Sequence, residues 1–332
     1  LPPGGGSAIL TGCFKFPRES LEMRWFLLFL TLAFTLHAAR AVAQTATAEA
    51  EPKVKRSDTG DAQVGDQGED AEPLYVRVHE EAGQPKSLQT AIVRYRGKKD
   101  SEFEGRIVDL VGVVHIGQEA YYQDLNLRLA KYDSVLYELV APDGTRIKPE
   151  DLEKRRSILA SMQSGMKDML NLEYQLEKID YMADNFRHAD MSPAEFAEDL
   201  ERRGDSLFKM FARMMGAGLA SSAATGGDAG LLLALFSDDR PKRMKQAMAR
   251  QLVDIEVVTA GLDDANGENT LIKGRNAKAF SILRDELEAG KKKLAVFYGA
   301  GHLPDMAERL ETDFDMVDRK TTWLDAWDLT KN

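Results

Sequence analysis

The 332-residue chain contains 54 acidic and 44 basic residues, giving a formal net charge of −10, and 43% of its residues are hydrophobic. This acidic balance provides no electrostatic footprint for nucleic acid, so no nucleic-acid partner is expected. Cys13 is the single cysteine, which excludes an internal disulfide and a thiolate metal cluster. Any bound metal must therefore be held by histidine and carboxylate side chains.

The first 73 residues are predicted to be targeting and linker sequence. The first methionine is Met23, and we expect residues 1–22 to be an upstream extension without a structural role. Residues 23–43 are predicted to be a signal peptide, because an apolar stretch after Arg24 ends in Ala41-Val-Ala43, a pattern that signal peptidase cleaves. That stretch is too short to span a bilayer.

Residues 44–73 are polar and acidic and are predicted to form a disordered linker. We therefore expect an exported protein, periplasmic or extracellular, without a stable membrane anchor after cleavage.

A single α/β domain is predicted over residues 74–330. Alternating or apolar β-branched runs predict strands, and the run between the third and fourth strands has a helical pattern, as in a βαβ unit. These elements are strands at 74–79, 88–96, 103–114 and 133–138, with the helix at 118–131.

The middle of the chain, from about 149 to 260, has apolar residues at helical spacing and is predicted to be a long all-helical insert. Within it, Ser192-Pro193 followed by Glu195 predicts a helix start with a capping box. The sheet pattern then returns, so the fold predicted is α/β, with a central mixed sheet that brackets the insert. The returning elements are a helix at 275–288, a strand at 294–298, a short helix at 304–310 and a strand at 314–324.

Two of the five histidines, His115 and His302, follow apolar runs that end in glycine. Ligands of open α/β sheets bind beyond the carboxyl ends of the strands, so both imidazoles are candidate site residues. The alternative is that each belongs to an ordinary glycine-capped turn.

Glu138 ends the strand that follows the His115 strand along the chain, and we expect these two strands to be neighbours. A carboxylate at the end of an apolar strand needs a cation or a donor. Two imidazoles and one carboxylate form a common hydrolytic metal set, which makes His115, Glu138 and His302 candidate metal ligands. The alternative is a structural salt bridge between Glu138 and an arginine.

Three further residues are candidates for catalysis. His188 and Asp190 lie in a polar stretch before a capped helix and could supply a ligand or a general base, or simply organise the turn. Arg275 opens a helix, where it could stabilise an oxyanion or pair with Glu138 to hold the fold.

These residues together resemble the ordered motifs of the TraB/GumN/Tiki group, over residues 88 to 325. The motif segments are Gly112-Val-Val-His115, Tyr137-Glu138-Leu139, Arg275-Asn276 and Tyr298-Gly-Ala-Gly-His-Leu-Pro304. One departure is Gly274, where the group often has glutamate before Arg-Asn.

The resemblance implies an α/β fold with a helical insert, related to erythromycin-esterase-like and haem-binding ChaN-like proteins. It also implies a metal-dependent hydrolase or peptidase, with manganese or cobalt as the metal suggested for eukaryotic Tiki members. By motif, His115, Glu138 and His302 would be metal or catalytic residues.

Two functions are open on this basis. The first is an exported metal-dependent hydrolase, peptidase-like, that uses Mn, Co or Zn on a peptide or small-molecule substrate. The second is a non-catalytic binder of a haem-like ligand or a signalling peptide, which the methionine-rich segments at 162–169 and 210–215 would suit. A metal-free esterase with His115 as general base is a third route.

Overall fold

The computed structural model describes residues 75–147, 170–206, 209, 234, 237, 239–260 and 269–331. The predicted signal peptide and linker lie outside these residues, as do most of the helical stretches expected from 149 to about 180 and from 206 to 219. Among the described helices, none combines the length and the apolar character needed to cross a bilayer.

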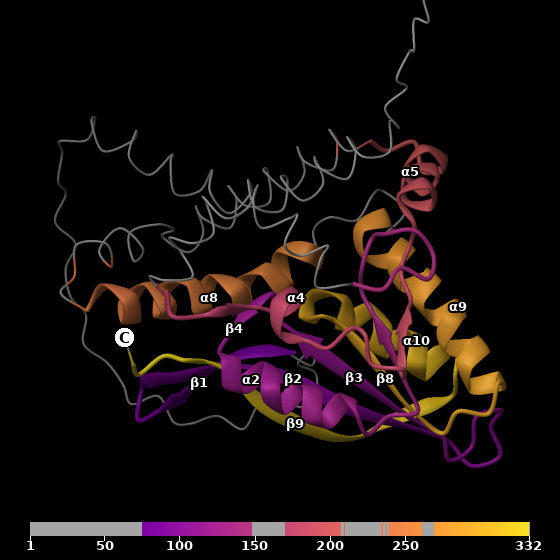
Figure 1. Cartoon of the computed structure of the whole chain (residues 1–332), viewed down its shortest axis with the longest axis horizontal. Coiled ribbons are helices and arrows are strands. Elements are labelled where there is room, and N and C mark those ends of the chain that lie inside the picture. Colours follow the sequence, from indigo (N-terminus) through magenta and orange to yellow (C-terminus); the bar gives the residue numbers. More distant parts are fainter. Residues whose placement is uncertain are drawn as a thin grey trace, which may run out of the picture. The chain divides into compact units, whose positions relative to one another are not determined.

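In the part of the chain that the structure describes, a mixed sheet of seven strands forms the centre of the domain (Figure 1). Its strands are β1 (Val76–Glu81), β2 (Gln84–Gly97), β3 (Ile107–Val113), β5 (Ser134–Tyr137), β7 (Phe186–His188), β8 (Lys293–Gly299) and β9 (Met316–Asp328). Two short strands, β4 (Ile116–Gly117) and β6 (Glu173–Tyr174), pair separately. The α/β class predicted from the sequence is confirmed.

The strand order is β1-β2-β3-β8-β5-β7, with β9 also paired to β2. Strands β3, β8, β5 and β7 are parallel, whereas β1, β2 and β9 run antiparallel to their partners. The expectation that the His115 and Glu138 strands are neighbours is wrong, because β8 lies between β3 and β5. A strand from much later in the chain takes that position, which local sequence does not reveal.

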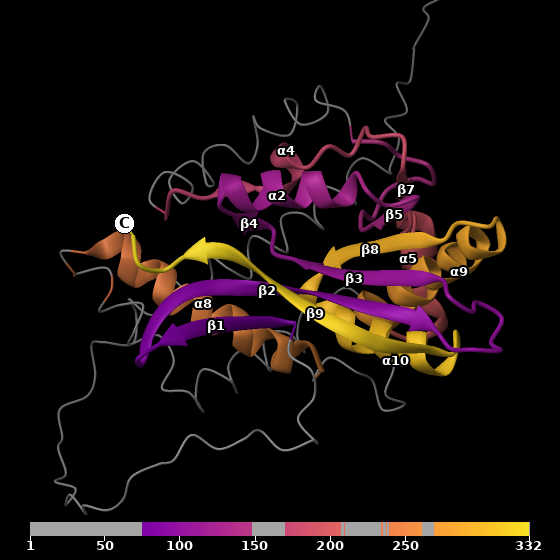
Figure 2. The same cartoon turned by 90° about the horizontal axis from the view of Figure 1, so that it is seen from below.

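Helices cover both faces of the sheet. They are α2 (Glu119–Leu129), α4 (Gln175–Lys178), α5 (Pro193–Arg202), α8 (Arg240–Ala260), α9 (Arg275–Glu288) and α10 (Leu303–Thr312), with a π-helical turn η1 (Thr270–Gly274) and a 3-10 turn η2 (Ala300–His302). Figure 2 shows α2 and α4 over one face and α8 and α10 over the other. The predicted capping box is present at α5, where Ser192 and Glu195 satisfy each other's backbone amides.

The structure does not show an all-helical insert. In its described part β6 and β7 interrupt the helical pattern, and β7 is the outermost strand of the parallel half of the sheet. A three-residue strand that gains its order from pairing with β5 has too little periodicity of its own to be predicted.

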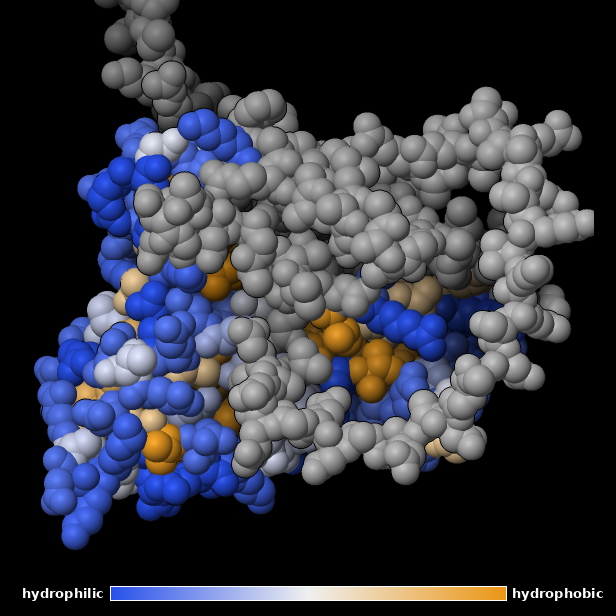
Figure 3. Space-filling model, turned by 180° about the vertical axis from the view of Figure 1, so that it is seen from behind, coloured by the Kyte–Doolittle hydropathy of each residue, from blue (hydrophilic) through white to orange (hydrophobic). Residues whose placement is uncertain are grey.

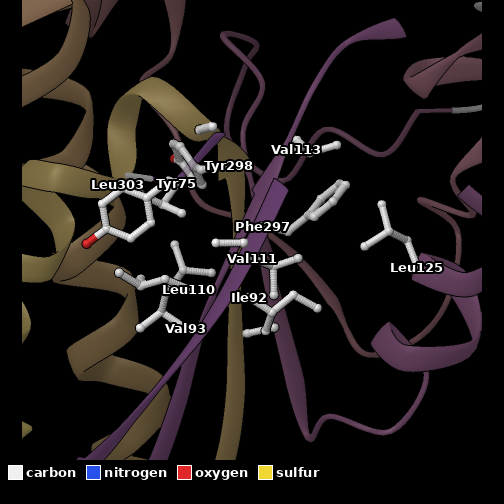
Figure 4. Packing of buried hydrophobic residues seen from close by; sticks show 14 of the residues in the cluster. Tyr75, Ile92, Val93, Leu110, Val111, Val113, Leu125, Phe297, Tyr298 and Leu303 are labelled. Atoms are coloured by element: carbon white, nitrogen blue, oxygen red, sulfur yellow. The ribbon is translucent and has the colours of Figure 1, made fainter. Parts of the chain in front are cut away.

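The core lies on both sides of the parallel strands, since successive residues of a strand face opposite ways. Figure 4 shows Val111, Val113 and Phe297 on the side of α2 and its Leu125, and Leu110, Tyr298 and Leu303 on the opposite side. All seven of these side chains are at most 2% exposed. Such double-sided burial explains the largely apolar sequences of β3 and β8. The outer surface seen in Figure 3 is mostly hydrophilic where it is described.

Candidate functional site

The carboxyl ends of the parallel strands lie side by side at one edge of the sheet. Val113 at the end of β3 is in register with Gly299 at the end of β8, and Tyr137 at the end of β5 is in register with His188 in β7. Glu138 directly follows β5, and His115 and His302 follow β3 and β8 within three residues. This is the edge at which α/β sheets bind ligands.

Arg275 is the centre of a buried charged cluster at this edge. Its Nη2 donates to Oε1 of Glu138 at 2.7 Å and to Oδ2 of Asp190 at 2.5 Å, and its Nε donates to Oδ1 of Asp190 at 3.0 Å. Asp190 is fully buried and Arg275 is 5% exposed. One cation therefore neutralises two carboxylates only in part, and the three side chains carry a net charge of −1. The pairing of Arg275 with Glu138 is the structural alternative that the sequence left open.

Glu138 is held in its ionised form. Burial acts to raise its pKa, but Arg275, the two histidines and the Gly299 amide outweigh this effect and hold the pKa well below its usual range. The Gly299 amide donates to Oε2 at 2.8 Å. A Cβ at position 299 would lie 3.2 Å from the same oxygen, so glycine lets the carboxylate approach the strand end.

His302 is neutral and has a defined tautomer. The Asn276 amide Nδ2 donates to the His302 carbonyl at 3.0 Å and to Oδ2 of Asp305 at 2.8 Å, so its Oδ1 must face the ring. Nδ1 of His302 donates to that oxygen at 2.7 Å. The lone pair of His302 is therefore on Nε2, which lies 3.4 Å from Nη1 of Arg275 and 3.6 Å from Oε1 of Glu138.

Burial, with Arg275 acting in the same direction, lowers the pKa of His302 to about 4, although Glu138 and Asp190 oppose this shift. At neutral pH the cluster thus contains an uncharged imidazole beside an ionised carboxylate.

His115 is the exposed member of the site. Its Nδ1 lies 3.0 Å from Oε1 of Gln175, whose Nε2 donates to the Tyr181 hydroxyl at 2.9 Å. The backbone N–H of Gln175 also donates to the His115 carbonyl, so the first residue of α4 holds both the ring and the backbone of His115. By the same reasoning as for His302, Nδ1 donates to this Gln175 oxygen, and no hydrogen bond to Nε2 is present among the described residues. His115 is close enough for its charge to act on Glu138.

His188 and Asp190, the two candidates before the capped helix α5, have different surroundings. Asp190 belongs to the cluster through Arg275, whereas Nε2 of His188 donates to the Leu139 carbonyl at 2.6 Å and its ring packs edge-on against Tyr137. His188 therefore holds the segment after β5. A catalytic role for either residue stays a prediction.

The described residues include no group of three or more histidine, aspartate or glutamate side chains arranged to hold a metal ion. Glu138 and His302 are close enough to share an ion, but the guanidinium of Arg275 already contacts both of them. The residues as arranged do not fit a three-ligand metal centre. Metal binding by His115, Glu138 and His302 remains a prediction.

Sequence reasoning missed the two carboxamides. Asn276 lies within the quoted Arg-Asn motif, and its position next to Arg275 at a helix start was the available signal. Gln175 had no such signal, because it reaches His115 only through the pairing of β4 with β6.

The fold and this edge define an α/β protein with a buried carboxylate–guanidinium–imidazole cluster beside an exposed histidine. The chain matches no model of a known protein family, no curated protein and no solved structure. The resemblance to the TraB/GumN/Tiki group therefore rests on the motif residues alone.

Proposed function

We propose that this protein is a hydrolase whose reaction takes place at the carboxyl ends of β3, β5 and β8. The observation that supports this most is that His115 and His302 are oriented in the same way, each by a carboxamide oxygen at Nδ1. This oxygen accepts from Nδ1 of each ring, so in the neutral form of His115 and of His302 the lone pair lies on Nε2, at the same edge as the ionised Glu138. Oriented bases beside a fixed charge are the parts that hydrolysis requires.

His115 is the group that takes the proton from the attacking water. It is exposed, its Nε2 makes no hydrogen bond to the described residues, and the negative charge of Glu138 stabilises the imidazolium that forms. The water oxygen bonds to the substrate carbonyl carbon while its proton passes to Nε2. The same nitrogen then returns the proton to the leaving group.

Arg275 acts through its partners. Because Asp190, Glu138 and His302 occupy its donors, it positions these groups and keeps Glu138 ionised and His302 neutral. Glu138 and His302 are the inner wall of the site, and His115 is its solvent-facing side.

The metal-dependent version of this hydrolase is a separate form of the proposal. A divalent Mn, Co or Zn ion, held by His115, Glu138 and His302, would lower the pKa of a bound water. Export, peptidase-like specificity and a peptide or small-molecule substrate are proposed together with it. The methionine-rich segments that would favour a haem or peptide binder lie outside the described residues.

The test is a hydrolysis screen of the purified protein against ester, peptide and amide substrates, in chelator and then with Mn²⁺, Co²⁺ or Zn²⁺ added. We expect turnover that persists in chelator. Turnover that depends on added metal would replace the metal-free mechanism by the metal-dependent one. Absence of turnover in every arm would contradict the hydrolase.

A further inference from the structure

A polar cavity lies at the end of the parallel strands opposite to the Arg275 cluster, between the sheet and the carboxyl end of α2. Its volume is about 160 Å³. Side chains from β2, β3, α2, β8 and β9 converge on it. They are Ile92, Arg94, Asp109, Arg128, Lys131, Tyr132, Lys293 and Thr322.

The buried carboxylate of Asp109 lines this cavity, and both of its oxygens accept hydrogen bonds. Both oxygens of Asp109, which is 1% exposed, accept from Arg94, at 2.8 Å from Nε and 2.7 Å from Nη2. The Tyr132 hydroxyl donates to the same carboxylate at 2.5 Å. Asp109 is thus already paired with a cation, the guanidinium of Arg94.

The rim carries positive charge that the described residues do not balance. Arg128 pairs with Asp124 at 2.9 Å, but Lys131 and Lys293 have no carboxylate partner in the described part of the chain. The ammonium of Lys293 lies over the Tyr132 ring, 4.4 Å from its centroid, which places it at the cavity wall. Two cations without a carboxylate partner among the described residues therefore flank one small cavity in a protein of net charge −10.

We propose that this cavity binds a phosphate group. A compact dianion suits two unpaired ammonium groups, and the Arg128 guanidinium and the Thr322 hydroxyl line the same space as additional donors. The volume admits a phosphate with a small organic substituent but no large ligand. This site is at the amino ends of β3 and β8, so it is separate from the proposed hydrolytic edge.

Isothermal titration with inorganic phosphate and with glycerol phosphate tests this, at constant ionic strength balanced with chloride. We expect saturable binding of one phosphate per chain, weakened about tenfold or more in the double variant Lys131→Gln/Lys293→Gln, because this variant loses two charge-assisted hydrogen bonds to the phosphate. Lys99→Gln removes an exposed charge elsewhere and should bind as the wild type does.

Tighter binding of glycerol phosphate would identify the ligand as a phosphate monoester, and tighter binding of inorganic phosphate would identify the free ion. Both results support the site. Unsaturable heats, or equal binding in the double variant and the wild type, would overturn it. A loss of the same size in Lys99→Gln would show a nonspecific charge effect and also overturn it.

Discussion

Asn276 Oδ1 accepts a hydrogen bond from Nδ1 of His302 at 2.7 Å, and this contact decides where the imidazole proton lies. Because the amide nitrogen of Asn276 is committed to the His302 carbonyl and to Asp305, the amide cannot turn over without losing both bonds. The unprotonated Nε2 of His302 is thereby fixed toward Glu138 and Arg275. Ring orientation by a neighbouring group of this kind is common around functional histidines.

Replacing Asn276 with aspartate should raise the pKa of His302 above its value of about 4, because a carboxylate at Nδ1 stabilises the imidazolium. An NMR titration of the His302 ring measures this directly. Asn126→Asp, a change of the same kind at α2, is the control and should leave the titration unchanged. An unchanged pKa in Asn276→Asp would contradict the assigned contact.

Replacing Arg275 with methionine should lower the free energy of unfolding by about 3–5 kcal/mol, because two buried carboxylates lose their shared cation. Urea denaturation at pH 7 gives the value. Arg284→Met breaks an exposed pair with Glu102 and should cost no more than about 1 kcal/mol. Similar losses in the two variants would show that the cluster at Arg275 is not buried as described.

Stability should fall as the pH is lowered from 6.5 to 4. The pKa of His302 is about 4 in the folded chain and 6.5 in its ordinary state. In this window the unfolded chain binds the extra proton, so the free energy of unfolding rises with pH, by about 3 kcal/mol for the full shift. Glu138, whose pKa is also lowered, adds a loss in the same direction at still lower pH.

The measurement is urea denaturation at several pH values for His302→Gln. This variant should lack most of the slope between pH 4 and 6.5. His79→Gln, which changes a histidine on β1, is the control and should retain the slope. A wild-type slope in His302→Gln would assign the pH dependence to other groups.

The strands that end at the site were predictable because each has a recognisable apolar pattern in its own sequence. Lys293–Gly299 and Ser134–Tyr137 are buried on both faces and are apolar throughout or nearly so, which is why strands at 294–298 and 133–138 were expected. Their order was not predictable. The insertion of β8 between β3 and β5 is decided by packing across the whole domain. It places Glu138, after β5, next to His302, after β8. Contrary to expectation, the strand that leads to His115 is therefore not adjacent to the Glu138 strand.

The site was predictable in its members but not in its connections. Glu138, Arg275 and His302 could be selected because each lies at the end or start of an element. That Arg275 contacts Asp190 as well as Glu138 depends on the path of the chain between β7 and α5, which has no periodic signature. Gln175 reaches His115 through two short strands, and such pairing has no local pattern in the sequence.

Replacing Gly274 with alanine should destabilise the protein although alanine favours helices. Gly274 has helical dihedral angles, φ −62° and ψ −47°, so helix propensity alone predicts a gain of about 0.5–1 kcal/mol. A Cβ there would lie 2.7 Å from Oδ2 of Asp199, which is buried and bonded to Thr270 and Arg203. We expect a net loss of about 1–3 kcal/mol in thermal or urea unfolding.

The exposed helix position Ser281 in α9 is the matched control, and Ser281→Ala should change stability by no more than about 0.5 kcal/mol. A gain in stability for Gly274→Ala would contradict the close packing of Asp199 against η1.

The central claim, that His115 is the base of a hydrolytic site at the strand ends, is tested most directly by the kcat/KM of His115→Asn. The substrate is the one that the wild type turns over fastest in the hydrolysis screen, and His79→Asn is the control. We predict a loss of about 100-fold or more in His115→Asn with an unchanged unfolding transition, and wild-type turnover in the control. Wild-type turnover in His115→Asn would contradict the claim.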